Sequence, residues 1–178
     1  GRSGGGDFGL VRYDAAGALD ATFGVGGLVT TDIGAFDEAF AVALQADGKI
    51  VAAGTSAPAG FCCQFALARS HSNGSLDTSF GSGGVVTTIF GGSTQAFAVA
   101  IQADGKIVAV GSTSSPFADS FALARYNPNG SLDAGFGSGG KVTTDLGGFD
   151  EARGIAIRAD GRLVVVGAAG PSNDFVVV

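Results

Sequence analysis

The sequence has no methionine or tryptophan, and only two cysteines, four prolines and one histidine among its 178 residues. Charged residues are also scarce, at 15%. Proteins built from long helices or coiled coils are rich in charged helix formers, so this composition argues against both architectures. Ten basic residues against sixteen acidic ones give a net charge of −6. We therefore expect no nucleic-acid partner.

Long apolar runs are missing as well, and any targeting signal is expected to lie outside these residues. The longest apolar runs, such as 39–44, 96–101 and 163–166, are far shorter than the ~20 residues of a membrane helix. We therefore expect no membrane insertion. The chain opens with Gly1 and no basic and apolar targeting signal, so we expect a processed or excised piece of a longer chain.

Glycine and small apolar residues are abundant instead. The chain has 32 glycines, 46% hydrophobic residues and a mean hydropathy of +0.37. Such a composition excludes disorder as the main state. A chain of this length can bury a sizeable core without metals or disulfides.

The strongest signal is an internal repeat. The segment 8–13 recurs as 65–70 and again, at almost the same spacing, as 121–126. Length varies in only one connection per copy, which is typical of a packed element repeated in tandem. We predict a single repeat domain over 1–178, with blade-like units at 8–64, 65–120 and 121–174 and the start of a further unit at 175–178.

Each unit is predicted to hold four short strands. In the second copy they are Phe65–Ser70, Val85–Ile89, Phe97–Ile101 and Ile107–Gly111. Asp104-Gly105 between the last two predicts a hairpin, because both central residues of a tight turn favour positive φ. The same dipeptide recurs at 47–48 and 160–161.

The third strand of each unit is apolar on both faces. Strict alternation places Phe40, Val42 and Leu44 on one face and three alanines on the other. A large face and a small face suit a sheet that is sandwiched between neighbours of its own kind. Arg153 replaces the phenylalanine in the third copy, which predicts a solvated edge or a charged partner there.

Four antiparallel strands per unit, buried on both sides, predict an all-β fold made of β-propeller blades, with a solenoid as the alternative. Typical propellers have four to eight blades, so three units cannot close a ring. The chain is then a piece of a longer propeller, half of a six-bladed ring made by two chains, or a subunit that stacks head to tail into a filament.

Two runs carry a family resemblance: FALARYNPNGSLDAGFGSGGKVTT at 121–144 and IRADGRLVVVG at 157–167. They resemble the delta-60 repeat, a bacterial β-propeller family, and the resemblance extends over all three units. It implies a setting in large secreted or surface-attached bacterial proteins. The family has no agreed activity, so no catalytic residue is carried over.

Arginine and aspartate recur eight residues apart in all three copies. We expect each arginine to form a structural bridge with the aspartate of its own copy. The alternative is a ring of arginines that binds an anion in a central channel. The pairs are Arg12 with Asp20, Arg69 with Asp77, and Arg125 with Asp133.

The loop after the third copy's first strand has oxygen-bearing side chains at alternate positions. Asn127, Asn129, Ser131 and Asp133 are therefore calcium candidates. We favour the alternative of an Asn-Gly turn with local hydrogen bonds, because the other copies supply few carboxylates. We accordingly expect no cofactor.

Three further features have structural explanations. The Phe-Gly-x-Gly-Gly motif at 23–27, 80–84 and 136–140 is expected to form a corner, since no helix follows to bind a phosphate. Cys62 and Cys63 lack zinc-site spacing; they form a vicinal disulfide, bridge to another chain or stay reduced. Paired acids at 37–38 and 150–151 are expected to be solubilising charges at a sheet edge.

The function expected from these features is that of a noncatalytic structural or interaction module of a secreted or cell-surface protein. Its variable loops at 55–64 and 112–120 would present a surface to a protein, a glycan or other copies of itself. The alternatives are a filament subunit and a carbohydrate-acting enzyme with its site at the mouth of a completed propeller. An enzyme is disfavoured because the unique polar residues form no recognisable catalytic set.

Overall fold

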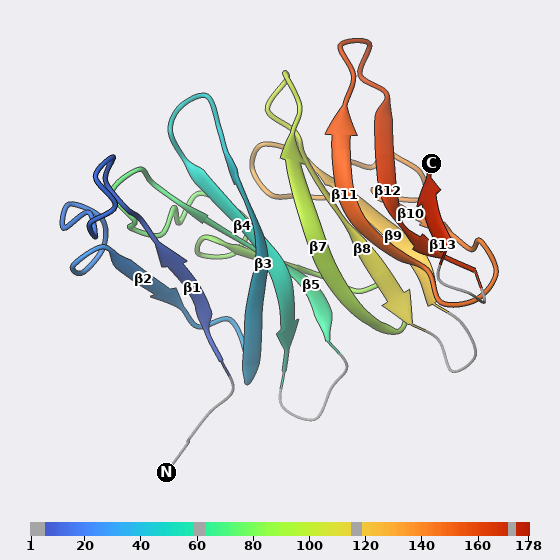
Figure 1. The fold of residues 1–178 in the computed structure, drawn as a ribbon, viewed down its shortest axis with the longest axis horizontal. Helices are drawn as coiled ribbons and strands as arrows, with labels where there is room; N and C mark the ends of the chain where they lie inside the picture. Colours follow the sequence, from blue (N-terminus) through green and yellow to red (C-terminus); the bar gives the residue numbers. More distant parts are fainter. Residues whose placement is uncertain (1–5, 59–62, 115–118, 171–173) are drawn as a thin grey trace.

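A computed structural model describes residues 6–58, 63–114, 119–170 and 174–178 (Figure 1). These residues form strands and turns and contain no helix, so none of them forms a helix that could cross a membrane. The predicted all-β fold is confirmed. The strands are β1 (Phe8–Val11), β2 (Leu28–Thr31), β3 (Phe36–Leu44), β4 (Ile50–Ala57), β5 (Gln64–Ser70), β6 (Val85–Thr88), β7 (Ser93–Ile101), β8 (Ile107–Ser114), β9 (Asp119–Tyr126), β10 (Lys141–Thr144), β11 (Glu151–Ile157), β12 (Leu163–Ala169) and β13 (Asp174–Val177).

The strands form four antiparallel sheets that follow one another along the chain. Sheet I is β1–β2, sheet II is β3–β4–β5–β6, sheet III is β7–β8–β9–β10 and sheet IV is β11–β12–β13. Strand β7 contacts both β3 and β11, so the first strands of sheets II, III and IV lie side by side. This arrangement is that of consecutive propeller blades. In each four-stranded sheet the first two strands are the inner pair and the last two are the outer pair.

The sheets begin and end at other strands than the predicted blade-like units do. A unit such as 65–120 was expected to form one sheet, but its first two strands, β5 and β6, complete sheet II. Its last two strands, β7 and β8, begin sheet III. The physical reason is the antiparallel pairing of β4 with β5, which holds the end of one repeat and the start of the next in one hydrogen-bonded ladder.

From sheet I to sheet III, successive sheets pack a large apolar face against a small one. Between sheets II and III, Phe65 and Leu67 lie against alanines of sheet III. Phe8 and Leu10 of sheet I likewise face alanines of sheet II. The alanines that receive these side chains are Ala96, Ala109, Ala122 and Ala124 in the first case and Ala39, Ala52, Ala66 and Ala68 in the second.

A β-bulge corrects the expected faces of the third strand. Ala39 pairs with Gly54 and Ala41 with Ala53, which leaves Phe40 as the extra residue. Because the bulge interrupts the alternation, Ala39 and Val42 lie on one face: their partners on β4, Gly54 and Ala52, are two residues apart. The same irregularity falls at Phe97 in β7 and at Arg153 in β11.

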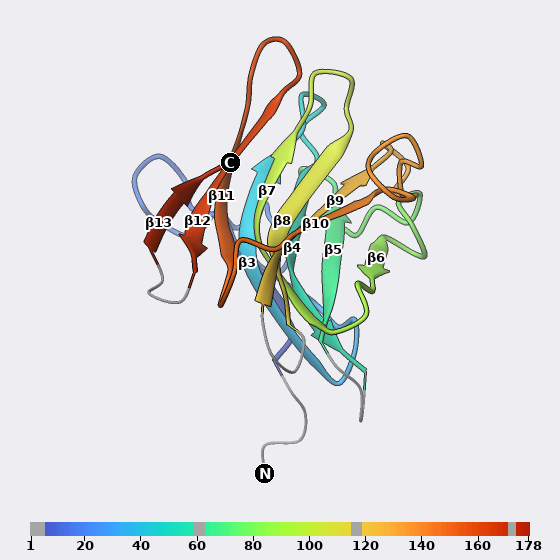
Figure 2. The same ribbon diagram turned by 90° about the vertical axis from the view of Figure 1, so that its right-hand side faces the viewer.

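The Asp-Gly hairpins lie together at one end of the molecule (Figures 1 and 2). Their turns differ from the expected two-residue form. Gly48 N donates to Gln45 O, and Gln45 N donates to Lys49 O, so the turn spans one residue more. Only the glycine needs the left-handed conformation, with φ of 83° at Gly48.

A glycine opposite each bulge is required by close approach rather than by φ. A Cβ atom at Gly111 would lie 1.8 Å from the carbonyl oxygen of Gln95, and at Gly54 and Gly167 the corresponding distance is 1.9 Å. Gly9, by contrast, has no atom within 4 Å of such a Cβ, and alanine stands at its equivalent, Ala66.

We expect Gly111→Ala to lower the free energy of unfolding by about 2 to 3 kcal/mol, because β7 must shift away from β8. Urea unfolding followed by circular dichroism measures the loss. Gly9→Ala is the matched control and should leave the midpoint unchanged. Equal midpoints for the two variants would contradict this account of the bulge.

Candidate functional site

The three arginines lie next to their aspartates. Arg12 Nε donates to Asp20 Oδ2 at 2.9 Å, and the same bond is 2.8 Å long in the other two copies, from Arg69 to Asp77 and from Arg125 to Asp133. Each guanidinium also lies over a phenylalanine of its own copy, with its central carbon 4.5 to 4.7 Å from the ring centroid. These rings are Phe23, Phe80 and Phe136.

Two of the arginines also connect neighbouring repeats. Arg69 Nη1 donates to the carbonyl oxygen of Pro128 in the next copy, at 2.5 Å. Arg12 makes the corresponding bond to the carbonyl oxygen of Ser72. A guanidinium that binds a carboxylate, an aromatic face and a distant carbonyl is held as a fixed cross-link. This arrangement favours the structural bridge over a ring of free arginines.

Each aspartate in the second and third copies has a further cation. Lys49 Nζ lies 3.4 Å from Asp77 Oδ2, and Lys106 Nζ lies 3.1 Å from Asp133 Oδ2. Sequence reasoning missed these lysines, although both follow the repeated Asp-Gly dipeptide. Because each lysine belongs to the repeat unit before that of its aspartate, the pair adds a second link between repeats.

The hydrogen bonds lower the pKa of these aspartates. The Ser79 hydroxyl is the main cause at Asp77, whose pKa lies well below its usual value with further help from Arg69 and Lys49. Lys106 is the main cause at Asp133, whose pKa is also lowered. At Asp20, where the pKa is lowered too, the main cause is the Thr22 hydroxyl.

The calcium candidates of the third copy bond to one another and to nearby cations. Asn129 Oδ1 accepts from the backbone nitrogen and the hydroxyl of Ser131, and Asn127 Nδ2 donates to that hydroxyl. Asp133 Oδ2 accepts from Arg125 and lies beside Lys106. The loop is therefore built as an Asn-Gly turn whose oxygens face donors of the chain itself.

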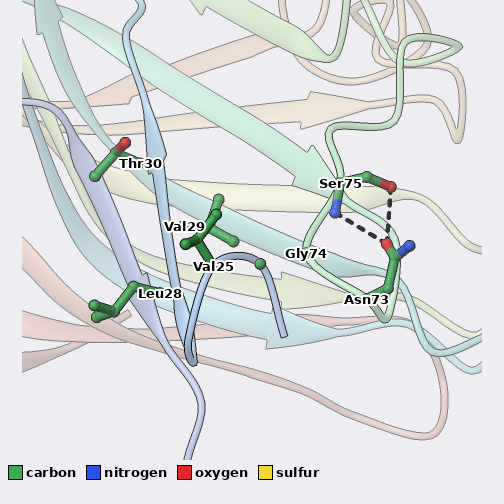
Figure 3. A pocket seen from close by; sticks show the side chains of 8 residues that line it. Val25, Leu28, Val29, Thr30, Asn73, Gly74 and Ser75 are labelled. Atoms are coloured by element: carbon green, nitrogen blue, oxygen red, sulfur yellow. Dashed lines mark hydrogen bonds between the residues drawn. The ribbon is translucent and has the colours of Figure 1, made fainter. Parts of the chain in front are cut away.

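A groove lies between the Phe-Gly-x-Gly-Gly loop of the first repeat and the Asn-Gly turn of the second (Figure 3). Gly24 N donates to Asn73 O at 2.8 Å, and Gly81 N makes the same bond to Asn129 O. The groove offers hydrogen-bonding groups, but its lining residues include no acid, base or thiol. It is lined by Gly24, Val25, Leu28, Val29, Thr30, Asn73, Gly74 and Ser75.

The three bulged residues form a ladder across the inner strands. The rings of Phe40 and Phe97 have centroids 5.4 Å apart, and the Arg153 guanidinium lies 4.0 Å from the Phe97 centroid. Arg153 also donates to Glu151 of its own strand. A solvated edge or a charged partner was the expectation at Arg153; its side chain is 54% exposed, and it makes an aromatic contact and a local ion pair. Sequence reasoning compared these positions but did not bring them together.

The remaining candidates lie in less informative places. Cys63 is half-buried, and Cys62 lies outside the described residues, as do 59–62 and 115–118 of the two variable loops. The paired acids are not both solvated: Asp37 and Asp150 are buried, whereas Glu38 is exposed. Backbone nitrogens of the preceding turn bind both buried carboxylates, which explains their position.

A family model described as "Domain of unknown function (DUF5122) beta-propeller" matches residues 2–23, 45–80 and 102–136, just over half of the chain. The chain belongs to this family. Each matched segment of the DUF5122 chain contains one arginine, its aspartate and its phenylalanine from the clusters described above. No curated protein matches the chain.

The cluster of Arg69, Asp77 and Phe80 predicts a pH-dependent contribution to stability. Because the pKa of Asp77 is lower in the folded than in the unfolded chain, its contribution is present above about pH 4 and is lost as the pH falls further. At pH 7 we expect Asp77→Asn to cost about 2 kcal/mol, because a buried guanidinium loses its carboxylate. Urea unfolding between pH 7 and pH 3 should show that the difference in free energy of unfolding from the unsubstituted protein begins to narrow below about pH 4.

The matched control is Asp20→Asn, whose aspartate side chain is 26% exposed against 4% for Asp77. Solvent screening weakens that pair, so its substitution should cost much less. A gap for Asp77→Asn that stays constant from pH 7 to pH 3 would refute the assignment.

Proposed function

We propose that the chain is a noncatalytic interaction module that joins a second copy of itself through its two incomplete end sheets. The observation that carries the proposal is the exposed apolar side of β3. Val42 is 58% exposed and Leu44 is 71% exposed, although both lie on a strand that packs against β4 and β7. An apolar surface of this kind is typical of an interaction site.

The exposure follows from the size of sheet I. By repeat position β1 and β2 match β5 and β6, the outer pair of sheet II. Among the described residues sheet I has no inner pair, so nothing in this part covers Val42 and Leu44. Their equivalents in β7, Val99 and Ile101, are covered because they pack on a core that includes Val51 of β4.

The other end of the chain holds the matching part. By repeat position β11 and β12 are an inner pair, equivalent to β3 and β4. If β12 of one copy pairs with the free edge of β1 in another copy, the two half-sheets form one four-stranded sheet. The inner pair then lies over Val42 and Leu44, as β4 lies over Val99 and Ile101.

In the single chain, strand β13 pairs with that edge of β12, so β13 must dissociate before β1 of another copy can bind there. It pairs with β12 along the short stretch from Val166 to Ala169. The dipeptide Asp-Phe starts both the β1 and the β13 segments, at 7–8 and 174–175. The exchange therefore replaces one strand with a close equivalent, as in domain swapping.

Two exchanges between two copies give a closed ring of six sheets, and one exchange per copy in succession gives a filament. We favour the ring, because it leaves neither half-sheet open. The resemblance to delta-60 repeats supports a place outside a bacterial cell, in a secreted or surface-attached protein. A protein or glycan partner for the variable loops fits that setting.

Light scattering after gel filtration tests the proposal. We expect a mass of twice 17.4 kDa at micromolar concentration, or a higher series if the assembly stays open. Val42→Lys combined with Leu44→Lys should yield a folded single chain, since both side chains are exposed in the single chain.

Val25→Lys is the control, because Val25 is 85% exposed and lies in the turn before β2, away from β3. It should leave the mass of the assembly as it is. The mass of a single chain at every concentration, for the unsubstituted protein, would overturn the proposal.

A further inference from the structure

We propose that Asp7, Asp32 and Asp37 form a calcium-binding site where the chain passes from sheet I to sheet II. The site is separate from the residues considered as calcium candidates in the third copy. It also goes beyond self-association, because neither inference requires the other.

The ladder of sheet I brings the first two aspartates together. Phe8 of β1 pairs with Thr31 of β2, so Asp7 just before β1 and Asp32 just after β2 lie opposite each other. Asp37 is the second residue of β3, which starts directly after the turn that follows β2. One carboxylate oxygen from each aspartate lies within 4.8 Å of those of the other two.

Asp37 adds an independent observation that points to a ligand. It is only 2% exposed, and its Oδ2 accepts from the backbone nitrogens of Ile33 at 2.7 Å and Gly34 at 2.9 Å. Its Oδ1 is buried and has no hydrogen-bond partner among the described residues. A buried carboxylate oxygen is costly unless a donor or a cation satisfies it.

The charges of the cluster are also unbalanced. Within the described ranges, no ion pair includes Asp7, Asp32 or Asp37, although the aspartates of the arginine clusters are all paired. Three carboxylates this close repel one another, and most strongly near a buried member. A bound cation removes that repulsion.

The second copy shows that the fold does not need these acids. There the equivalent residues are Gln64, Ile89 and Thr94. Thr94 N still donates to Cys63 O, just as Asp37 N donates to Gly6 O. The corner thus keeps its backbone bond without any carboxylate.

The third copy keeps two of the acids but uses them differently. Ser120 stands in place of Asp7, and both oxygens of Asp150 accept backbone bonds, from Leu146 N and Gly170 N. Asp145 accepts from Gly147 N. Only the first corner combines three carboxylates with a buried oxygen that lacks a partner, among the corners described.

The donor set favours calcium over other ions. Carboxylate oxygens bind hard cations, and the site offers no sulfur or imidazole for zinc or copper among the described residues. Calcium accepts irregular geometry with water and backbone carbonyls as further ligands, whereas magnesium requires a near-octahedral set. Two of the three aspartates are exposed, which leaves room for water ligands.

Isothermal titration of the metal-free chain with calcium chloride at pH 7 tests the proposal. We expect one ion per chain, with a dissociation constant on the order of 10⁻⁴ M. At a hundredfold excess over that constant, the melting temperature should rise by about 5 °C relative to EDTA. Magnesium chloride should bind more weakly.

Asp32→Asn should weaken calcium binding roughly tenfold and remove the thermal shift. Asp32 is exposed and makes no ion pair among the described residues, so the fold of the variant should survive. Asp145→Asn, the equivalent change in the third copy, should leave both measurements as they are. The proposal would be overturned if calcium produced no heat of binding and no rise in melting temperature. Tighter binding of magnesium than of calcium, or an equal loss of calcium binding in both variants, would also overturn it.

Discussion

The packing of the first three sheets depends on the fit between a sheet with large apolar side chains and a neighbour with alanines. Phe65 and Leu67 can approach the next sheet only because Ala109, Ala122 and Ala124 leave space for them. Interiors of this density tolerate little change in volume. The fit recurs from sheet I to sheet III, and at sheet IV Phe121 and Leu123 meet Ala152 and Val165 instead. Packing of each unit on the next explains why the spacing of the repeat is constant while one loop per copy varies in length.

Most of the fold could be predicted because its signals are local. The recurrence of segments, the apolar runs between glycine turns and the Asp-Gly dipeptides all lie within short stretches of sequence. They predict the number of strands per unit and the presence of the hairpins. The link from Arg69 to Asp77 was also within reach, since only one tight turn separates the two side chains along the chain.

Three features were out of reach because they depend on residues far apart in the chain. The repeat shows where strands lie but not which strands share a ladder, so the boundaries of the sheets were misplaced. The bulge at Phe40 is hidden because the residues around it still alternate in size. Asp7 and Asp32 lie on opposite sides of a long connection, and only the pairing of β1 with β2 reveals that they meet.

The offset between repeats and sheets has a mechanical consequence. Sheet II takes its inner strands from one repeat and its outer strands from the next, so every complete blade is shared between two sequence units. Unravelling one unit strips hydrogen bonds from the blades on both of its sides. Under tension applied along the chain, one repeat therefore cannot unfold without disrupting the sheets that it shares with its neighbours.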